Sequence, residues 1–191
     1  MENDKNYLLL GLTLLSAALV SGCSTNLTEV EKEGIKYVRE IEKMARDVYS
    51  YFYDLWETAI MNTISQSEQV HMDTIKPLID GYGLDDPAEG KGAGEFINQD
   101  LQQLYYDLTS QGSSSETDAL IVASKIEEID ILDIKNYLEQ TDEKDIDNAY
   151  NSLIEGSSNH LRIFVSHLSD KGVEYQPYYL SQQDYDDIIN R

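Results

Sequence analysis

Apolar residues recur every three or four positions along most of the chain, which is the spacing of one face of an α-helix. The first such segment begins at Thr28 and Glu31, which are spaced to form a capping box. Glycine and proline are rare inside the periodic segments, so we expect the helices to be long. The pattern predicts long helices over residues 28–57, 59–80, 115–139 and 141–172, and short helices over 99–110 and after 181.

Capping residues and helix-breaking residues mark several of these boundaries. Asn98 is positioned to cap the first short helix, and Ser113 with Glu116 forms a second capping box ahead of the third long helix. We expect a kink near Asp130 in that helix. Gly81 should end the second long helix before a Gly-rich loop. Two pairs of long helices joined by a longer connection predict an all-α fold, a four-helix bundle with a crossover that contains the short helix.

The N-terminus has a different character from the rest of the chain. Residues 7–22 form an apolar and small-residue run, short for a membrane span, that leads directly to Cys23. Residues 20–23, VSGC, are similar to the lipobox of bacterial and archaeal lipoproteins, in which the cysteine becomes lipid-modified. The alternative is an uncleaved N-terminal anchor. Both alternatives predict an extracytoplasmic domain tethered to a membrane.

These observations divide the chain into four segments. We expect a lipoprotein signal peptide over residues 1–22, then a lipid-anchored tether and helix start over 23–34. The bundle should occupy 35–172, and an aromatic C-terminal tail over 173–191 should pack on it.

Charge and cysteine content exclude several function classes. The chain has 36 acidic and 14 basic residues, for a formal net charge of -22, which disfavours binding to nucleic acid and favours small cations as partners. Cys23 is the only cysteine in the sequence. An intrachain disulfide, a thiolate metal cluster and a cysteine nucleophile in the folded domain are therefore excluded.

The second long helix places two polar residues on its apolar stripe. Glu68 and His71 are three residues apart, so both should point into the bundle interior. Burial of such groups requires compensation. A metal ion provides it economically, since carboxylate oxygen and imidazole nitrogen both bind iron, manganese and zinc. The alternative is a Glu–His hydrogen bond within a structural polar network.

Other predicted helices offer similar groups at comparable positions. Glu42 lies on the apolar face of the first long helix, 29 residues before His71. Its alternative role is a surface ion pair with a neighbouring lysine or arginine. Glu127 on the third long helix and His160 on the fourth repeat the order Glu, then His. Glu128 is the alternative inward residue, but the neighbours of Glu127 on the helix face are more apolar.

This arrangement resembles the ferritin-like di-metal carboxylate proteins, in which glutamates and Glu-x-x-His motifs surround a pair of metals. Five stretches resemble, more closely, an uncharacterised ferritin-like family of prokaryotes that is catalogued as a domain of unknown function: EIEKMARDVY (40–49), SEQVHMDTIKPLIDGYGLDDP (67–87), IEEIDILDI (126–134), GSSNHLRIFV (156–165) and YQPYYLSQQDY (175–185). The resemblance implies a ferritin-like four-helix bundle with a metal site. It implies no established substrate.

One position departs from the di-metal pattern. Ser157 stands three residues before His160, where a second glutamate would be expected, and Asp130 could supply the missing carboxylate. The alternative is a site with one metal, or with two held asymmetrically. The predicted metal ligands are Glu42, Glu68, His71, Glu127, Asp130 and His160.

These ligands suit one or two ions of iron or manganese, with zinc as an alternative. One functional hypothesis is an oxidase or peroxidase that uses dioxygen or peroxide. The other is a non-catalytic, lipid-anchored module for metal handling or protein interaction. The tether argues against a cage-forming ferritin, and a homodimer is kept as a candidate assembly.

Overall fold

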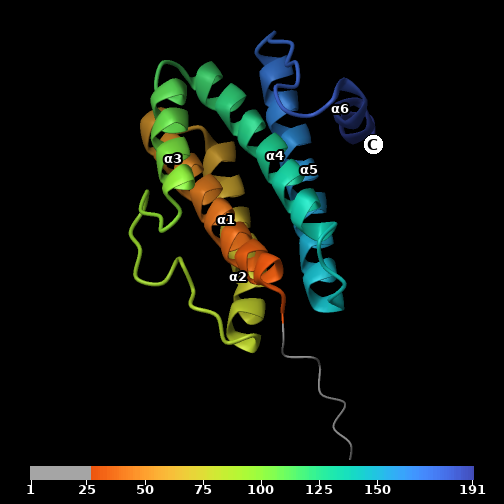
Figure 1. The fold of residues 1–191 in the computed structure, drawn as a ribbon. Helices are drawn as coiled ribbons and strands as arrows, with labels where there is room; N and C mark the ends of the chain where they lie inside the picture. Colours follow the sequence, from red (N-terminus) through yellow and green to blue (C-terminus); the bar gives the residue numbers. More distant parts are fainter. Residues whose placement is uncertain (1–26) are drawn as a thin grey trace, which may run out of the picture.

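The computed structural model describes residues 27–191, and Figure 1 shows their fold. This part of the chain contains six α-helices and no strand. The helices are α1 (Glu29–Trp56), α2 (Ala59–Gly81), α3 (Gln99–Gly112), α4 (Glu116–Leu138), α5 (Lys144–Asp170) and α6 (Gln182–Ile189). The predicted all-α class is confirmed. Cys23 and the predicted signal peptide lie outside the described residues.

The four long helices pack into a bundle. Helix α1 pairs with α2 and α4 pairs with α5, while α1 also contacts α4 and α2 contacts α5. The connection between the two pairs contains α3, which lies against α1 and α4 (Figure 1). The α2–α5 side therefore lacks the cover that α3 provides on the α1–α4 side.

Two predicted helix starts had different outcomes. The capping box of Thr28 and Glu31 is present at the start of α1. The predicted capping box of Ser113 and Glu116 is wrong, because Ser115 caps α4 and accepts a hydrogen bond from the Asp118 amide. Helix α3 continues further than expected, to Gly112, so the Ser113 hydroxyl instead donates to a carbonyl in the last turn of α3.

Helix α4 runs without interruption from Glu116 to Leu138, so the expected kink does not divide it. Asp130 lies in its interior and is fully buried. Pro77 is likewise accommodated within α2, which ends at Gly81 as predicted. Asp130 is therefore not a helix cap, and its carboxylate must be explained by its neighbours in the core.

A belt of polar residues separates two apolar clusters in the bundle interior. One cluster, at the end nearer α3, includes Phe52, Ile64 and Phe164. The other, at the opposite end, includes Val38 and Leu153. Buried glutamates, an aspartate and two histidines from the four long helices lie between these clusters. The polar belt is thus at mid-depth in the bundle, where bulk water does not solvate charged groups.

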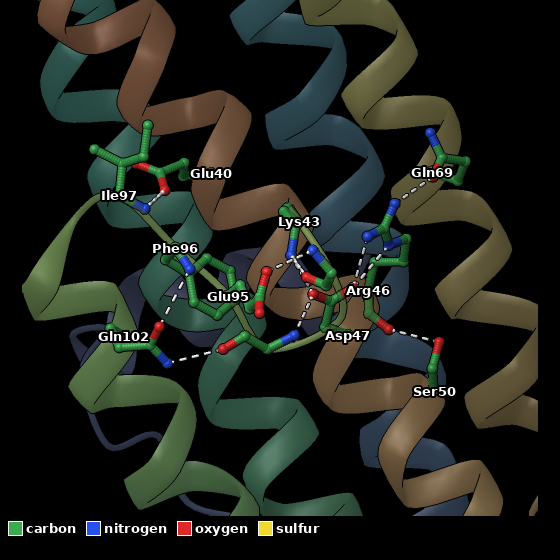
Figure 2. A network of polar contacts seen from close by, with 12 residues as sticks. Glu40, Lys43, Arg46, Asp47, Ser50, Gln69, Glu95, Phe96, Ile97 and Gln102 are labelled. Atoms are coloured by element: carbon green, nitrogen blue, oxygen red, sulfur yellow. Dashed lines mark hydrogen bonds and ion pairs between the residues drawn. The ribbon is translucent and has the colours of Figure 1, made fainter. Parts of the chain in front are cut away.

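A polar network ties the α2–α3 connection to α1 (Figure 2). Lys43 is almost completely buried, forms an ion pair with Asp47 at 2.6 Å and lies over the ring of Phe96. Asp47 accepts a hydrogen bond from the Gly94 amide. Glu40 accepts hydrogen bonds from backbone amides at the end of the same connection. The carboxylates of α1 thereby hold an otherwise irregular segment against the bundle.

The C-terminal segment packs against the bundle through side chains that include Tyr175, Leu180, Tyr185 and Ile188, all of which are buried. Helix α6 contacts α5. No helix within residues 27–191 combines the length and apolar character that crossing a membrane requires.

Candidate metal centre

All four long helices contribute to one buried cluster of acidic and imidazole side chains, the central cluster. Helix α1 provides one member, α2 and α4 two each, and α5 one: Glu42, Glu68, His71, Glu127, Asp130 and His160. The four carboxylates have no exposed surface, whereas the two histidines are 9% and 6% exposed. The fold therefore brings together every residue that the sequence nominated as a metal ligand.

Glu68 is the centre of this cluster. Its Oε2 lies 2.7 Å from Nδ1 of His71, and its Oε1 lies 2.8 Å from Nδ1 of His160. The two imidazole rings stack with their centroids 5.1 Å apart. The carboxylate of Glu68 thus spans two histidines from different helices, and these three residues form a group that could hold a metal ion.

A second carboxylate accompanies each histidine. Glu42 Oε2 is 3.1 Å from Nδ1 of His71, and Glu127 Oε1 is 3.6 Å from Nδ1 of His160. Each Nδ1 carries at most one proton, so it can donate a good hydrogen bond to only one of its two carboxylate neighbours. The cluster contains more acceptors than its two histidines can satisfy.

Several buried atoms in the cluster consequently have no hydrogen-bond partner among the described residues. They are Glu42 Oε1, both oxygens of Glu68, Glu127 Oε2, both oxygens of Asp130 and Nδ1 of His160. The short contacts of Glu68 are within ion-pair distance but lack hydrogen-bond geometry. Unpaired buried carboxylate oxygens are costly, and a divalent cation compensates several of them at once. The donor set of oxygen and imidazole nitrogen fits iron, manganese or zinc.

The protonation equilibria of the cluster follow from burial and mutual proximity. Burial raises the pKa of Glu42 to about 8 and that of Glu127 to about 7. Burial would also raise the pKa of Glu68, but the two histidines outweigh it and lower that pKa to about 2. Burial lowers the histidine pKa values, yet the carboxylates raise them to about 11 for His71 and about 10 for His160. Without a metal ion, the cluster retains protons that a cation would displace.

Three neighbouring residues position the members of the cluster. The Tyr49 hydroxyl donates to Glu127 Oε1 at 2.7 Å, and Ser67 Oγ lies 2.9 Å from Nε2 of His160. A Cβ atom at Gly156 would lie 2.4 Å from Nε2 of His71. Sequence reasoning missed Ser67 and Gly156. A glycine inside a helical pattern was an available signal of close approach, whereas nothing marked Ser67.

The two neighbouring glutamates of α4 have different surroundings. Glu127 faces His160 and Tyr49, as described above. Glu128 faces the C-terminal segment, where it accepts hydrogen bonds from the Tyr175 hydroxyl and from three successive backbone amides, those of residues 178–180. In this structure the inward position is therefore that of Glu127.

Three further residues that the sequence analysis discussed are Glu42, Ser157 and Asp130. Lys43 and Arg46 both pair with Asp47, so neither forms an ion pair with Glu42. Ser157 is buried, but its hydroxyl donates to a carbonyl of its own helix and brings no charge to the cluster. Burial, together with the negative charges of Glu42, Glu127 and Glu68, raises the pKa of Asp130 well above its usual value.

Comparisons with known proteins place the chain in a family. The model of the family described as "Uncharacterized protein domain (DUF2202)" matches residues 31–191. The chain belongs to this family. This confirms the predicted relationship to a domain of unknown function, and the match includes every residue of the central cluster.

Uncharacterized protein MJ0754 of Methanocaldococcus jannaschii is 42% identical to the chain over 164 residues, which are 86% of the chain and 89% of the relative. The crystal structure of hypothetical protein MJ0754 from Methanococcus jannaschii DSM 2661 superimposes with a TM-score of 0.85 at 42% identity, and covers 87% of this chain and 95% of that one. The two proteins therefore share one fold. The name of the relative states no activity.

Proposed function

We propose that the chain is a ferritin-like metal-binding protein whose central cluster holds iron or manganese. The observation that carries this proposal is Glu68, a fully buried carboxylate whose two oxygens each lie within 2.8 Å of a different imidazole nitrogen. Glutamates and histidines from four helices converge on this point, and many of their donor atoms have no other partner among residues 27–191. A bound cation accounts for both features.

The grouping of the ligands supports a centre for two ions. Glu42 with His71 forms one half, Glu127 with His160 forms the other, and Glu68 is shared between them. The charges of Glu42, Glu127 and Glu68 act on Asp130. Its carboxylate would replace the one that is absent from α5 at Ser157. The other five carboxylate and imidazole ligands, together with Asp130, would give each ion oxygen and nitrogen donors.

The proposed activity is oxidation of Fe(II) or reduction of peroxide. Redox-active ions in the cluster would supply the electron transfer to dioxygen or peroxide. The protein's contribution is to orient the ligands and to exclude bulk water. Tyr49 holds Glu127 through its hydroxyl, Ser67 holds the outer nitrogen of His160, and the apolar clusters above and below limit solvent access.

The degree of burial favours a second candidate, a non-catalytic metal site. A structural site is closed, whereas a catalytic one keeps an open coordination position. The carboxylates here have no exposed surface and the histidines very little. A metal held in this way would stabilise the bundle by linking all four long helices.

We further propose that Cys23 anchors the protein to the outer side of a membrane, as its lipobox-like context indicates. The negative charge of the chain would raise the local concentration of cations around it.

Elemental analysis of the full-length chain tests metal binding directly. The wild type should retain one to two equivalents of iron or manganese after extensive dialysis, and the Glu68→Ala/His71→Ala variant should retain none. The matched control is Glu155→Gln, which changes an exposed acid on α5 and should retain the wild-type amount. A folded wild type that binds none of these metals, or zinc, would refute the proposal. Stopped-flow mixing with dioxygen or peroxide then separates the two candidates, because only a redox centre changes its absorption on mixing.

A further inference from the structure

A line of polar side chains leads from the central cluster toward the surface between α1 and α4. Asp133 lies three residues after Asp130, so the two carboxylates are neighbours on one face of α4. The Tyr37 hydroxyl of α1 donates a hydrogen bond to Asp133 Oδ2. Asp133 is only partly buried, whereas Asp130 is completely buried. Asp130 and Asp133 thus extend from the buried cluster toward the solvent.

Tyr37, at the outer end of this line, also lines a surface hollow of about 320 Å³. Its lining includes Tyr37, Tyr137, Glu33, Glu40 and Lys36. The rings of the two tyrosines contact each other, with centroids 5.5 Å apart. Glu33 is exposed at the hollow, while Glu40 is already occupied by backbone amides of the α2–α3 connection.

Asp130 distinguishes this line from an ordinary group of surface acids. Both of its carboxylate oxygens are buried and lack a hydrogen-bond partner in the described part of the chain. Its charged neighbours include Glu42 and Glu127 on the cluster side and Asp133 on the surface side. A fully buried carboxylate between two groups of carboxylates suits a transient position for a cation, since no protein donor competes for it.

The opposite face of the bundle offers a cation less attraction. The exposed atoms of the cluster belong to His71 on α2 and His160 on α5, because the carboxylates of the cluster have no exposed surface. Imidazoles are neutral or positive, so they do not concentrate cations from solution.

We propose that metal ions enter the central cluster from the hollow between α1 and α4, past Tyr37 and Asp133 to Asp130. The inference rests on the proposed function, because it describes how the cations of that site reach it. Asp133 attracts the ion, and Tyr37 covers Asp133 when no ion is passing. Asp130 then passes the ion to Glu42 and Glu127.

Stopped-flow absorption after mixing the metal-free, full-length chain with Co²⁺ measures the loading rate, and the final absorption measures the amount bound. Asp133→Asn keeps the side-chain shape but removes the charge, so loading should slow by about tenfold with the same final amount. Glu33→Gln at the exposed rim should slow loading less. Lys36→Gln removes a positive charge from the hollow and should accelerate it. The matched control Glu155→Gln makes the same charge change as Glu33→Gln on an exposed part of α5 and should load at the wild-type rate.

The outcomes separate this inference from the proposed function. A wild type that takes up no Co²⁺ contradicts the metal site itself, and the route with it. If the wild type takes up Co²⁺ and both Asp133→Asn and Glu33→Gln load at the wild-type rate, only the route is contradicted. Slower loading by Glu155→Gln than by Glu33→Gln would also contradict the route, because Glu155 does not line the hollow between α1 and α4. If circular dichroism shows that Asp133→Asn is unfolded, the opposite effects of Glu33→Gln and Lys36→Gln decide the question.

Discussion

Gly156 of α5 lies directly against the imidazole ring of His71 on α2. A Cβ atom at position 156 would stand 2.4 Å from Nε2 and 2.7 Å from Cε1 of that ring, which is closer than real side chains approach. The space occupied by His71 therefore exists because α5 has no side chain at this position. A glycine on one helix sets the position of a candidate ligand on another.

Replacing Gly156 by alanine should weaken metal binding by about tenfold or more, because His71 must move away from Glu68. Alanine favours the helical conformation over glycine by about 1 kcal/mol, so the backbone of α5 should remain intact. Calorimetric titration with Mn²⁺ or Co²⁺ measures the affinity. Gly81→Ala is the matched control, since no atom lies within 4 Å of its added Cβ. Equal affinities for the two variants would show that His71 is not held by this contact.

Glu127 and Glu128 are adjacent and equally buried, but we expect their glutamine variants to fail in different ways. Glu127→Gln should lower metal affinity while leaving the C-terminal segment in place. Glu128→Gln should leave metal stoichiometry unchanged and lower the free energy of unfolding by about 2 kcal/mol or more, because a charged acceptor of several hydrogen bonds is lost. Metal analysis, urea denaturation and limited proteolysis of the C-terminal segment provide the comparison. The same defect in both variants would contradict these separate roles.

Lys43 and Asp47 form a buried ion pair, and replacing Asp47 should destabilise the protein more than replacing Lys43. Asp47→Asn removes the carboxylate charge that pairs with the buried Lys43 ammonium and leaves it with neutral hydrogen-bond acceptors such as the Gly92 carbonyl. We expect it to reduce the free energy of unfolding by about 3 kcal/mol or more. Lys43→Met should cost less, since Asp47 retains Arg46 and the amide of residue 94.

A double-mutant cycle in guanidinium chloride measures the coupling between Lys43 and Asp47. The double variant should be more stable than Asp47→Asn alone, because it no longer buries an uncompensated ammonium group. Additive effects of the two substitutions would contradict the prediction. Metal stoichiometry serves as the internal control, because neither residue belongs to the central cluster.

Metal affinity should fall as the pH falls. The carboxylates raise the pKa of His71 to about 11 and that of His160 to about 10, so both imidazoles are protonated near neutral pH in the metal-free protein. A cation can bind these nitrogens only after the protons leave. The affinity should therefore decrease by about tenfold or more for each pH unit between 8 and 6. Competition titrations with a chelator at each pH measure this slope, and proton release into a weakly buffered solution measures the same exchange independently. An affinity that does not change with pH would exclude the imidazoles as ligands.

Much of the helical architecture could be read from the sequence because it depends on local spacing. The capping box at Thr28, the cap at Asn98 and the end of α2 at Gly81 follow from short-range backbone requirements. The sequence predicted Ser113 as the N-cap of α4, whereas the structure has Ser115 there, because α3 extends by two residues into the expected linker. Both serines are suitable N-cap residues by type, so the sequence alone does not distinguish them. Tertiary packing decides at which one the helix begins.

The sequence by itself determined that Glu68 and His71 share the apolar face of one helix, because residues three apart on a helix necessarily lie on the same side. Only the tertiary structure decided that Glu68 lies between His71 and His160, that Glu127 faces the cluster while Glu128 holds the C-terminal segment, and that Gly156 admits the ring of His71. Those relationships depend on the rotation of each helix about its axis and its depth against its neighbours. Both are set by the packing of side chains from distant parts of the chain, which local periodicity does not encode.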